Sequence, residues 1–555
     1  MHTLDTRQKK IAVFFIVISI VALYIVHINA YPLMEPDEGR YAEIPREMLA
    51  TGDFITPRLN GVEYFEKPAL QYWLTAASMY VLGENEGATR VVPAVTGIIN
   101  IFLTAWLGKM MFTNRTGLLT AVILATTTLH IVVGSINILD MMITMFMTLS
   151  LVSFYKARLS QNRKWYLLFY AAMAFGLLTK GLISIVLPLG IIFWYMVFTK
   201  KWNIARDIIY WPGILLFLVI SVPWFYLVCR ANPDFFYFFF IREHFLRFAT
   251  KMADRYKPFW FFIPMIILGV FPWLGFLPAL FVKNGIIRRT ESKKNKCDII
   301  FLLTWFFVVF LFYSFSDSKL VPYILPCLSA LAILLAASIR RASQLGRWIG
   351  GGLWINSIGC FIFVAALIVY SMQAGYLSAW QIFCTGWLIF LSLTIGLVCV
   401  ISVWFKTKQV RCTISAMSVV AFLFACGLQS IHNQVAVSRT TLYVAEDIRS
   451  TIRPGDIVVS YGDYVQGLAF YLQKRIVVAS YLGELEFGSK HPSGQGWFID
   501  DDQLINLWNS DKRVFIVFDK SKRNMLSNLH IVKNLHVIFN DEVRPKGGYY
   551  YIVNK

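Results

Sequence analysis

Charged residues are scarce in this sequence. They make up 15% of the 555 residues, whereas 57% are hydrophobic. Soluble domains carry roughly 25% charged residues, so this composition excludes an ordinary soluble domain. The run over residues 11–31 holds no formally charged residue and is long enough to cross roughly 30 Å of hydrocarbon as a helix. Lys9 and Lys10 precede this run, but no small-residue cleavage motif follows it, so we expect an uncleaved span.

Paired cysteines are also missing. All eight cysteines lie in or beside apolar runs, none follows residue 430, and no CxxC motif occurs. A disulfide framework outside the membrane and a structural zinc site of the usual spacing are therefore disfavoured. The chain also shows no internal repeat and, after residue 430, no glycine-rich phosphate loop.

The apolar runs predict an α-helical multi-pass membrane protein. Thirteen spans are expected near 11–31, 88–108, 117–134, 140–155, 165–179, 181–199, 207–229, 259–282, 299–316, 320–339, 348–370, 380–404 and 412–430.

The distribution of Lys and Arg predicts the orientation of these spans. With the N-terminus in the cytoplasm, the cytoplasmic segments hold 24 Lys and Arg residues, and the short outer connections hold two, Lys180 and Lys319. This asymmetry is typical of multi-pass membrane proteins, whose cytoplasmic loops carry an excess of Lys and Arg. The odd number of spans leaves residues 431–555 outside, with 15 basic and 13 acidic residues. The net charge of +20 therefore reflects membrane topology, and no nucleic-acid partner is expected.

Two outer loops, residues 32–87 and 230–258, are too long to be simple connectors. In the first, Pro36 favours a helix start and Gly52 a helix stop, and a second amphipathic stretch begins at Lys67. The tail after residue 430 alternates strand-like segments (456–462, 474–482, 512–519) with a helical one (501–510). We expect a membrane domain over 1–430 and a small α/β domain over 431–555 that carries no chemistry.

Ionisable and tyrosine side chains at the outer face are the candidates for function, because a charge near the bilayer is costly unless it is paired or hydrated. Loop 230–258 holds six basic and three acidic residues on the side that usually avoids Lys and Arg, which suggests an anionic ligand. The candidates are Asp37, Glu38, Arg40, Tyr41, Arg58, Glu66, Lys67, Asp140, Lys180, Arg242, Glu243, His244, Arg247, Lys251, Arg255, Lys257, Asp317, Lys319 and Tyr323.

Two segments carry a resemblance to a known family. PDEGRYAEIPREMLATGDFITPRLNGVEYFEKPALQYWL resembles the first outer loop of the polyprenyl-phosphate-dependent, protein-mannosyltransferase-like GT-C glycosyltransferases, and REHFLRF with KPFWFFIPMIILGVFPWLGFLP resembles the second. Together with GLLTKG and KLVPYILP, they look most like the bacterial lipid A 4-amino-4-deoxy-L-arabinose transferases. The resemblance covers residues 10–430 well and the tail loosely.

The resemblance implies an enzyme of the inner membrane that acts at the periplasmic face. It would move 4-amino-4-deoxy-L-arabinose from undecaprenyl phosphate to lipid A phosphates. The membrane lipids are the further expected partners, and we expect a monomer. The residues themselves leave another sugar or another acceptor, a glycolipid or a protein, open. A lipid transporter or flippase is a further alternative, disfavoured by the lack of repeated halves and by charges that gather on one face.

Cations suit this chemistry because a phosphate leaves and gains negative charge. Lys67 and Arg247 are the first candidates to hold that phosphate. Each of these residues also has a structural alternative to phosphate binding. These alternatives are snorkelling of Lys67 and Lys180, neutralisation of Glu243 by Arg247 and a position in the interfacial aromatic belt for Tyr323. The substrate-binding candidates are Arg40, Tyr41, Arg58, Lys67, Lys180, Arg247, Lys319 and Tyr323.

The catalytic candidates are the carboxylates Asp37, Glu38 and Asp140. A phosphate monoester acceptor has a second pKa of roughly 6 and is already ionised, so it needs little help from a base. Asp37 would instead position the acceptor or stabilise positive character on the sugar. The alternatives are a helix N-terminus for Asp37 and Glu38 and helix capping for Asp140.

Glu66 and His244 offer a carboxylate and an imidazole, which suit zinc or manganese. Two ligands are few for a metal site, and a hydrogen-bonded pair is the alternative. We expect no required cofactor and leave a divalent metal open.

Overall fold

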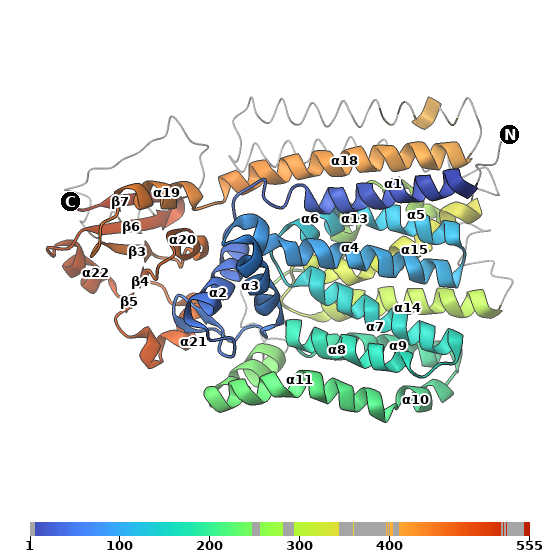
Figure 1. Cartoon of the computed structure of the whole chain (residues 1–555), viewed down its shortest axis with the longest axis horizontal. Coiled ribbons are helices and arrows are strands. Elements are labelled where there is room, and N and C mark those ends of the chain that lie inside the picture. Colours follow the sequence, from blue (N-terminus) through green and yellow to red (C-terminus); the bar gives the residue numbers. More distant parts are fainter. Residues whose placement is uncertain are drawn as a thin grey trace. The chain divides into compact units, whose positions relative to one another are not determined.

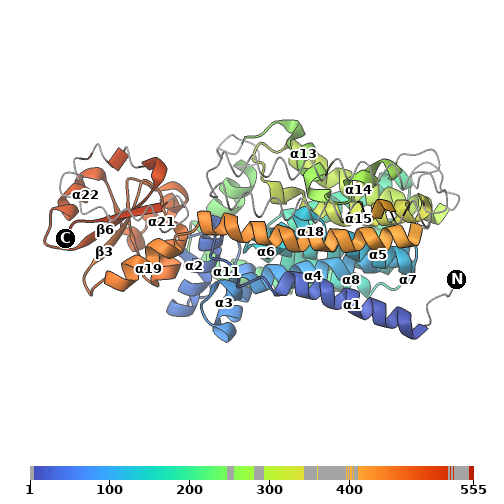
Figure 2. The same ribbon diagram turned by 90° about the horizontal axis from the view of Figure 1, so that it is seen from above.

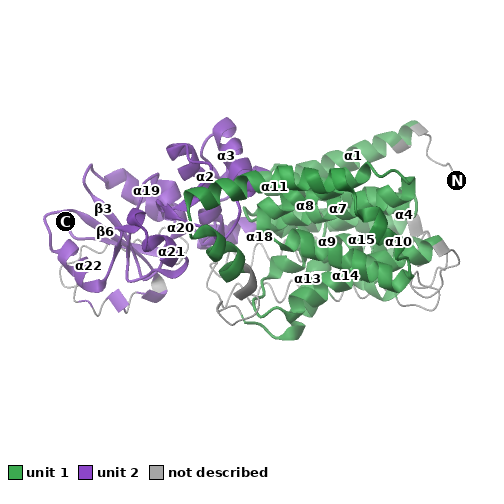
Figure 3. Cartoon of the chain, turned by 90° about the horizontal axis from the view of Figure 1, so that it is seen from below, with its two compact units in different colours: residues 1–27, 92–370, 383–430 green, residues 28–91, 371–382, 431–555 purple. Residues whose placement is uncertain are grey.

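The structure, a computed structural model, describes residues 6–246, 256–280, 293–342, 410–522 and 549–555, with isolated residues between 359 and 404 and between 525 and 529. The chain forms two compact units (Figure 3). Unit 1 comprises residues 1–27, 92–370 and 383–430, and unit 2 comprises 28–91, 371–382 and 431–555. The first outer loop thus folds together with the tail, whereas the sequence suggested a membrane domain over 1–430 that includes this loop.

Long apolar helices running side by side build unit 1 (Figure 1). α7 packs against α8, α8 against α11, and α14 against both α9 and α15. The helices that lie wholly or mainly in this unit are α1 (Thr6–Ile25), α4 (Glu86–Met111), α5 (Asn114–Ala125), α6 (Thr128–Ser135), α7 (Asp140–Ser160), α8 (Trp165–Lys180), α9 (Ile183–Thr199), α10 (Asn203–Ile208), α11 (Trp211–Ala231), α13 (Phe262–Val270), α14 (Lys293–Phe315), α15 (Leu325–Ala342) and α18 (Val410–Ser438). The unit also contains the π-helix η1 (Tyr237–Leu246) and the 3-10 helices η2 (Phe259–Phe261), η3 (Leu274–Leu280) and η4 (Val321–Ile324).

The expected multi-pass helical architecture is confirmed. Among the described residues, five helices are long and apolar enough to cross a membrane, or up to seven if each bent pair counts as one span. Helices occupy the predicted spans except 348–370 and 380–404, which lie almost entirely outside the described residues. Two predicted spans are broken: α5 and α6 meet at 61°, and the segments on either side of Phe271 and Pro272 meet at 112°.

A buried polar chain links five helices of unit 1. Tyr24 Oη lies 2.6 Å from His130 Nδ1, and Asn100 Nδ2 lies 3.1 Å from His130 Nε2. Ser329 Oγ lies 3.4 Å from both Asn100 Nδ2 and Thr148 Oγ1. Since water is absent from the bilayer core, such groups must satisfy one another. The network therefore fixes how α1, α4, α6, α7 and α15 pack.

The first outer loop of unit 2 forms the two expected helices. α2 (Asp37–Thr51) follows Pro36 and ends at Gly52, whose φ of 71° is left-handed, as the sequence predicts. A short antiparallel hairpin follows, with β1 (Arg58–Leu59) paired to β2 (Val62–Glu63), and then α3 (Leu70–Leu82).

The tail forms the predicted α/β domain. Its sheet has the order β5-β4-β3-β6-β7, with parallel pairing except between β6 and β7. The sheet lies among helices α19, α21 and α22 (Figure 2), and Val459, Ile516 and Trp508 contribute to its core. The elements are α19 (Leu442–Thr451), β3 (Ile457–Tyr461), α20 (Gln466–Leu472), β4 (Val477–Ala479), η5 (Gly483–Leu485), α21 (Glu486–Ser489), η6 (Pro492–Gly494), β5 (Phe498–Ile499), α22 (Asp501–Trp508), β6 (Val514–Asp519), η7 (Lys520–Lys522) and β7 (Tyr549–Val553).

Close contacts join the first outer loop to the tail. α2 packs against α20, and Gly39 meets the backbone of Gly467 so closely that a Cβ at Gly39 would collide with it. The Asn60 side chain also pairs with the backbone of Ile476 in both directions, at 2.9 and 3.0 Å. Loop and tail are therefore one folding unit.

Glu35 lies buried where the first outer loop contacts the tail, and we expect the stability of this contact to depend on pH. Its Oε1 accepts from Gly467 N at 2.7 Å and from Thr441 Oγ1 at 2.9 Å. Burial raises the pKa of Glu35 to about 8 from an ordinary value of 4.5, against the hydrogen bonds, which lower it. The folded state therefore holds a proton that the unfolded state has lost. Stability from this group is full below the unfolded pKa and is lost as pH rises through the folded pKa.

We expect α20 to open more readily as pH rises from about 5 to about 8, at up to about 1.4 kcal/mol per pH unit. Hydrogen exchange of residues 466–472, compared between the wild type and Glu35→Gln at each pH, measures this effect. The comparison cancels the intrinsic pH dependence of exchange. A ratio of the two rates that stays constant over this range would show that Glu35 does not titrate at this contact.

Candidate active site

Asp37 and Arg40 stand one turn apart at the start of α2. The Asp37 side chain is 52% exposed, whereas that of Arg40 is 7% exposed. Arg40 Nη1 lies 3.3 Å from Asp37 Oδ1. Its other edge binds Glu484 of the tail, with Nε 3.1 Å from Oε1 and Nη2 2.7 Å from Oε2. Asp37 is thus a half-exposed carboxylate beside a buried guanidinium that is fixed in place. The Asp37 carboxylate can contact a substrate that carries positive character.

Glu38, although it is the next residue, faces the interior. Its side chain is 2% exposed and binds Arg90 through both oxygens, at 2.7 and 2.8 Å. Met34 N also donates to Glu38, and Arg90 donates to the carbonyl of Tyr31 while its guanidinium lies 3.9 Å from that ring. This geometry favours a structural role for Glu38, and its predicted catalytic role has no geometric support.

Three tyrosines lie near Arg40. Tyr41 and Tyr72 are stacked with ring centroids 6.1 Å apart, and the Arg40 guanidinium lies 5.8 Å from the Tyr41 ring. The hydroxyls of Tyr64 and Tyr72 are buried and have no hydrogen-bond partner among the described residues. Burial raises the pKa of Tyr64 well above its usual value, so its hydroxyl stays protonated and can donate or accept a hydrogen bond. Sequence reasoning named Tyr41 but missed Tyr64 and Tyr72; the position of Tyr64 in the YFEKP motif was the available signal.

Arg58 is engaged within the hairpin. It lies 2.7 Å from Glu63 and 3.6 Å from Asp53. Glu63 also accepts from Ser493 at 2.5 Å and contacts His491. This set ties the hairpin to the tail, so the geometry favours a structural role for Arg58 over the predicted substrate binding.

Lys67 follows Glu66 at the partly exposed end of the loop. Its Nζ donates to the Glu66 carbonyl at 2.8 Å and lies 3.9 Å from the Glu66 carboxylate. The side chains are 18% and 19% exposed. The predicted pairing of Glu66 with His244 is not tested, because the His244 side chain lies outside the described residues. Within the described part of the chain, no three His, Cys, Asp or Glu side chains gather as a metal site.

In unit 1, the structure brings Asp140, Lys180 and Tyr323 together. Asp140 opens α7 and Lys180 ends α8, and the two lie 2.5 Å apart with side chains 13% and 12% exposed. Lys180 Nζ also lies 4.6 Å from the centroid of the Tyr323 ring. The capping position of α7 is occupied by Leu139, so Asp140 does not cap the helix. Asp140 instead forms an ion pair with Lys180, and this pairing replaces the snorkelling alternative for Lys180.

Other predicted residues are placed differently. Lys319 is 4% exposed and donates to the carbonyls of Lys257 and Ser316, at 2.9 and 2.5 Å, which favours a structural role. Arg242 lies over the Phe238 ring at 5.2 Å. The predictions for Arg247, Lys251 and Arg255 lie outside the described residues.

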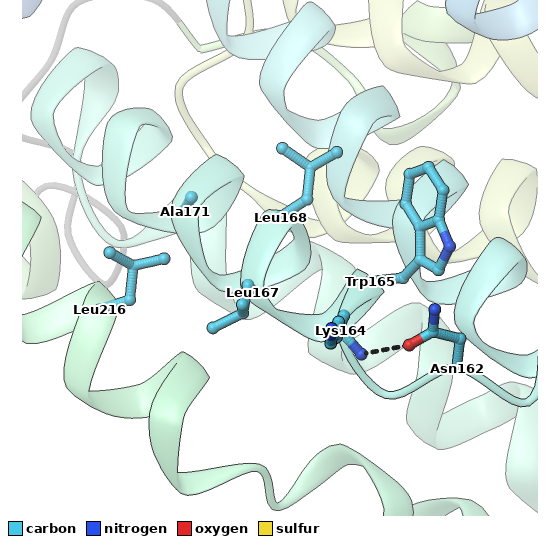
Figure 4. A pocket seen from close by; sticks show the side chains of 7 residues that line it. All are labelled: Asn162, Lys164, Trp165, Leu167, Leu168, Ala171 and Leu216. Carbon is cyan, nitrogen blue, oxygen red and sulfur yellow. Dashed lines mark hydrogen bonds between the residues drawn. The ribbon is translucent and has the colours of Figure 1, made fainter.

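A hollow of about 510 Å³ opens along α8 and α11 (Figure 4). It contains none of the predicted site residues, and Lys164 is the sole ionisable side chain in its lining. This hollow therefore lacks the paired charges of a transfer site. The lining residues are Asn162, Lys164, Trp165, Leu167, Leu168, Ala171 and Leu216.

Two family models match the chain. The model described as dolichyl-phosphate-mannose-protein mannosyltransferase matches residues 10–239. The model described as aminoarabinose transferase C-terminal domain matches residues 444–544. The first match covers α2, α3 and the spans up to α11, and the second covers most of the tail.

Curated relatives agree with the family models. The chain is 34% identical over 369 residues to the undecaprenyl phosphate-alpha-4-amino-4-deoxy-L-arabinose arabinosyl transferase of Yersinia enterocolitica, with 64% of this chain and 65% of that protein aligned. This alignment thus spans a little under two thirds of the relative. The protein of the same name from Pectobacterium atrosepticum is 31% identical over 538 residues, which cover 92% of each chain.

Solved structures show the same fold. The crystal structure of ArnT from Cupriavidus metallidurans bound to undecaprenyl phosphate matches with a TM-score of 0.83 and 26% identity, over 98% of both chains. The oligosaccharyltransferase of Archaeoglobus fulgidus matches with a TM-score of 0.51 and 12% identity, over 92% of this chain and 69% of that one. The second likeness shows the fold alone.

Proposed function

Because the chain belongs to the family of undecaprenyl phosphate-alpha-4-amino-4-deoxy-L-arabinose arabinosyl transferases, we propose that it transfers 4-amino-4-deoxy-L-arabinose from undecaprenyl phosphate to a phosphate of lipid A. The observation that carries this proposal is the alignment over 92% of a relative with that name, which includes both the spans and the tail. The exposed carboxylate of Asp37, set beside Arg40, supports it chemically.

In the proposed reaction, an oxygen of the acceptor phosphate forms a bond to the anomeric carbon. The bond from that carbon to the undecaprenyl phosphate oxygen breaks, and this phosphate leaves with the electron pair. Positive character on the sugar is stabilised by the Asp37 carboxylate, and cationic side chains, with Lys67 the first described candidate, offset the charge of the leaving phosphate. The acceptor phosphate is already ionised near neutral pH, so no general base is required.

The hydroxyls of Tyr64 and Tyr72 support recognition of a sugar. Both are buried and unpartnered within the described part of the chain, and a buried hydroxyl without a partner costs roughly 1–3 kcal/mol. Hydroxyl and amino groups of a sugar would satisfy them. Transfer of another polyprenyl-linked sugar is the second candidate, favoured by the mannosyltransferase model over residues 10–239.

Restoration of polymyxin resistance tests the substrate assignment. The sugar amine offsets the negative charge of lipid A phosphates and so weakens attraction for cationic peptides. Expressed in a transferase-null Gram-negative host that still makes the donor, the chain is expected to restore resistance and to add one pentosamine mass to lipid A. The Asp37→Asn variant is the control for expression. Correct membrane insertion with unmodified lipid A would reject this sugar or acceptor and leave the broader glycosyltransferase proposal standing.

We place the protein in the bacterial inner membrane with the site at the periplasmic face, on the basis of the 24-to-two distribution of Lys and Arg. A membrane-impermeant thiol reagent is expected to label Ser450→Cys from the periplasmic side, because Ser450 lies exposed on α19. Cys at residues 284–296 should react from the cytoplasmic side alone. Labelling of Ser450→Cys from the cytoplasm alone would invert the topology.

A further inference from the structure

The Arg40 guanidinium is shared between two carboxylates from distant parts of the sequence. Glu484, which lies 444 residues away in the tail, accepts from Nε and Nη2, whereas Asp37 meets Nη1 at 3.3 Å. The contact with Glu484 is the closer one and uses both oxygens, a geometry that aligns the planar guanidinium. Glu484 therefore sets the direction in which Arg40 points.

Glu484 is itself held firmly. It lies on the turn η5, its side chain is 15% exposed, and Gln466 at the start of α20 donates to its Oε1. Arg40 is nearly buried, and a buried cation that loses its partner is strongly destabilising. The tail thus supplies the anion that this buried cation requires.

We propose that Glu484 is a positioning residue for sugar transfer: by holding Arg40 from the side of the tail, it leaves the Asp37 carboxylate exposed to the substrate. The inference rests on the proposed function, because Asp37 is the carboxylate proposed to face the sugar. It also gives the tail, for which the sequence predicted no chemistry, a part in the reaction.

The consequence of losing Glu484 follows from the charges. Within the described residues, Asp37 is the other carboxylate at ion-pair distance from Arg40. When Glu484 becomes neutral, the buried cation attracts Asp37 into a closer ion pair, since opposite charges interact more strongly away from water. Asp37 is then less exposed and less able to stabilise the sugar.

Carboxyl labelling tests this consequence without any transfer assay. Purified full-length protein is treated with a carbodiimide and glycine ethyl ester, and the Asp37 peptide is quantified by mass spectrometry. Labelling of Asp37 is expected to fall several-fold in Glu484→Gln. The matched control is Glu486→Gln. It removes an equal charge two residues after Glu484, from a side chain that forms an exposed ion pair with Lys490. Unchanged labelling in Glu484→Gln, with the control also unchanged, would overturn the proposal.

Turnover tests the same inference through the reaction. Glu484→Gln is expected to lower kcat by about 10- to 100-fold, the size of effect that a misplaced group produces, with little change in KM for the lipid-linked donor. Because Glu484 acts through Arg40, adding Glu484→Gln to an Arg40→Gln variant should cost little more than Arg40→Gln alone.

The possible outcomes are distinct. Equal losses from Glu484→Gln in the presence and absence of Arg40 would mean that Glu484 acts on the substrate directly, which contradicts the proposal. A fall in thermal stability with unchanged Asp37 labelling would assign Glu484 a structural role alone. If the wild type transfers no sugar at all, the proposed function fails, but the labelling experiment still decides whether Glu484 controls Asp37.

Discussion

Asp37→Asn is expected to lower kcat by about 100- to 1000-fold, the range seen when one preorganised electrostatic contact is removed from an enzyme. The variant should fold normally, because Asp37 is 52% exposed and an exposed substitution changes stability by less than about 1 kcal/mol. Transfer from the lipid-linked donor and thermal unfolding in the same detergent measure the two quantities.

Two further variants give this prediction its controls. Asp502→Asn also removes a carboxylate from the first turn of a helix, in α22, and should change neither activity nor stability. Glu38→Gln should lower stability by about 3–5 kcal/mol, because it breaks a buried ion pair with Arg90. Near wild-type turnover of Asp37→Asn would assign the Asp37 carboxylate to structure.

The second large effect is expected at Asp140 and Lys180. Lys180→Met leaves the Asp140 carboxylate without its partner at 2.5 Å, which should cost about 3–5 kcal/mol of stability and abolish transfer. In the double variant Asp140→Asn/Lys180→Met neither charge remains, so folding should recover. If Lys180 binds an anionic substrate group, transfer should stay lost.

The double variant separates a role of this pair in the reaction from a purely structural one. Recovery of both folding and transfer would show that the Asp140–Lys180 pair serves the packing of α7 and α8 alone. Lys201→Met is the matched control, since the Lys201 Nζ contacts a thiol, Cys297 Sγ, at 3.2 Å instead of a carboxylate. It should leave both folding and transfer unchanged.

The sequence predicted the local elements well because their signals are local. Pro36 directly precedes α2 and Gly52 directly follows it, as the sequence predicts. The alternating segments predicted in the tail correspond to β3, β4, β6 and α22. The bend after α13 was missed, although Pro272 at the break was an available signal.

The candidate site was harder to predict because it depends on packing. The sequence alone does not distinguish Asp37 from Glu38. In the structure, Glu38 is buried in an ion pair with Arg90, whereas the Asp37 side chain is half exposed. Arg90 itself was read as part of a span. Glu484 reaches Arg40 across 444 residues, a contact that no local spacing could indicate. Lys180 and Asp140 were both named, but their pairing emerged only from the packing of α7 against α8.

A reconstituted transfer reaction is the direct test of the proposed function. The purified chain in lipid nanodiscs is given undecaprenyl-phosphate-linked 4-amino-4-deoxy-L-arabinose and lipid A, and both lipids are followed by mass spectrometry. We expect lipid A to gain one pentosamine while an equal amount of undecaprenyl phosphate appears, and Asp37→Asn to slow both changes by about 100- to 1000-fold. Donor that stays intact with folded wild-type protein, or transfer at an equal rate by Asp37→Asn, would contradict the proposed function.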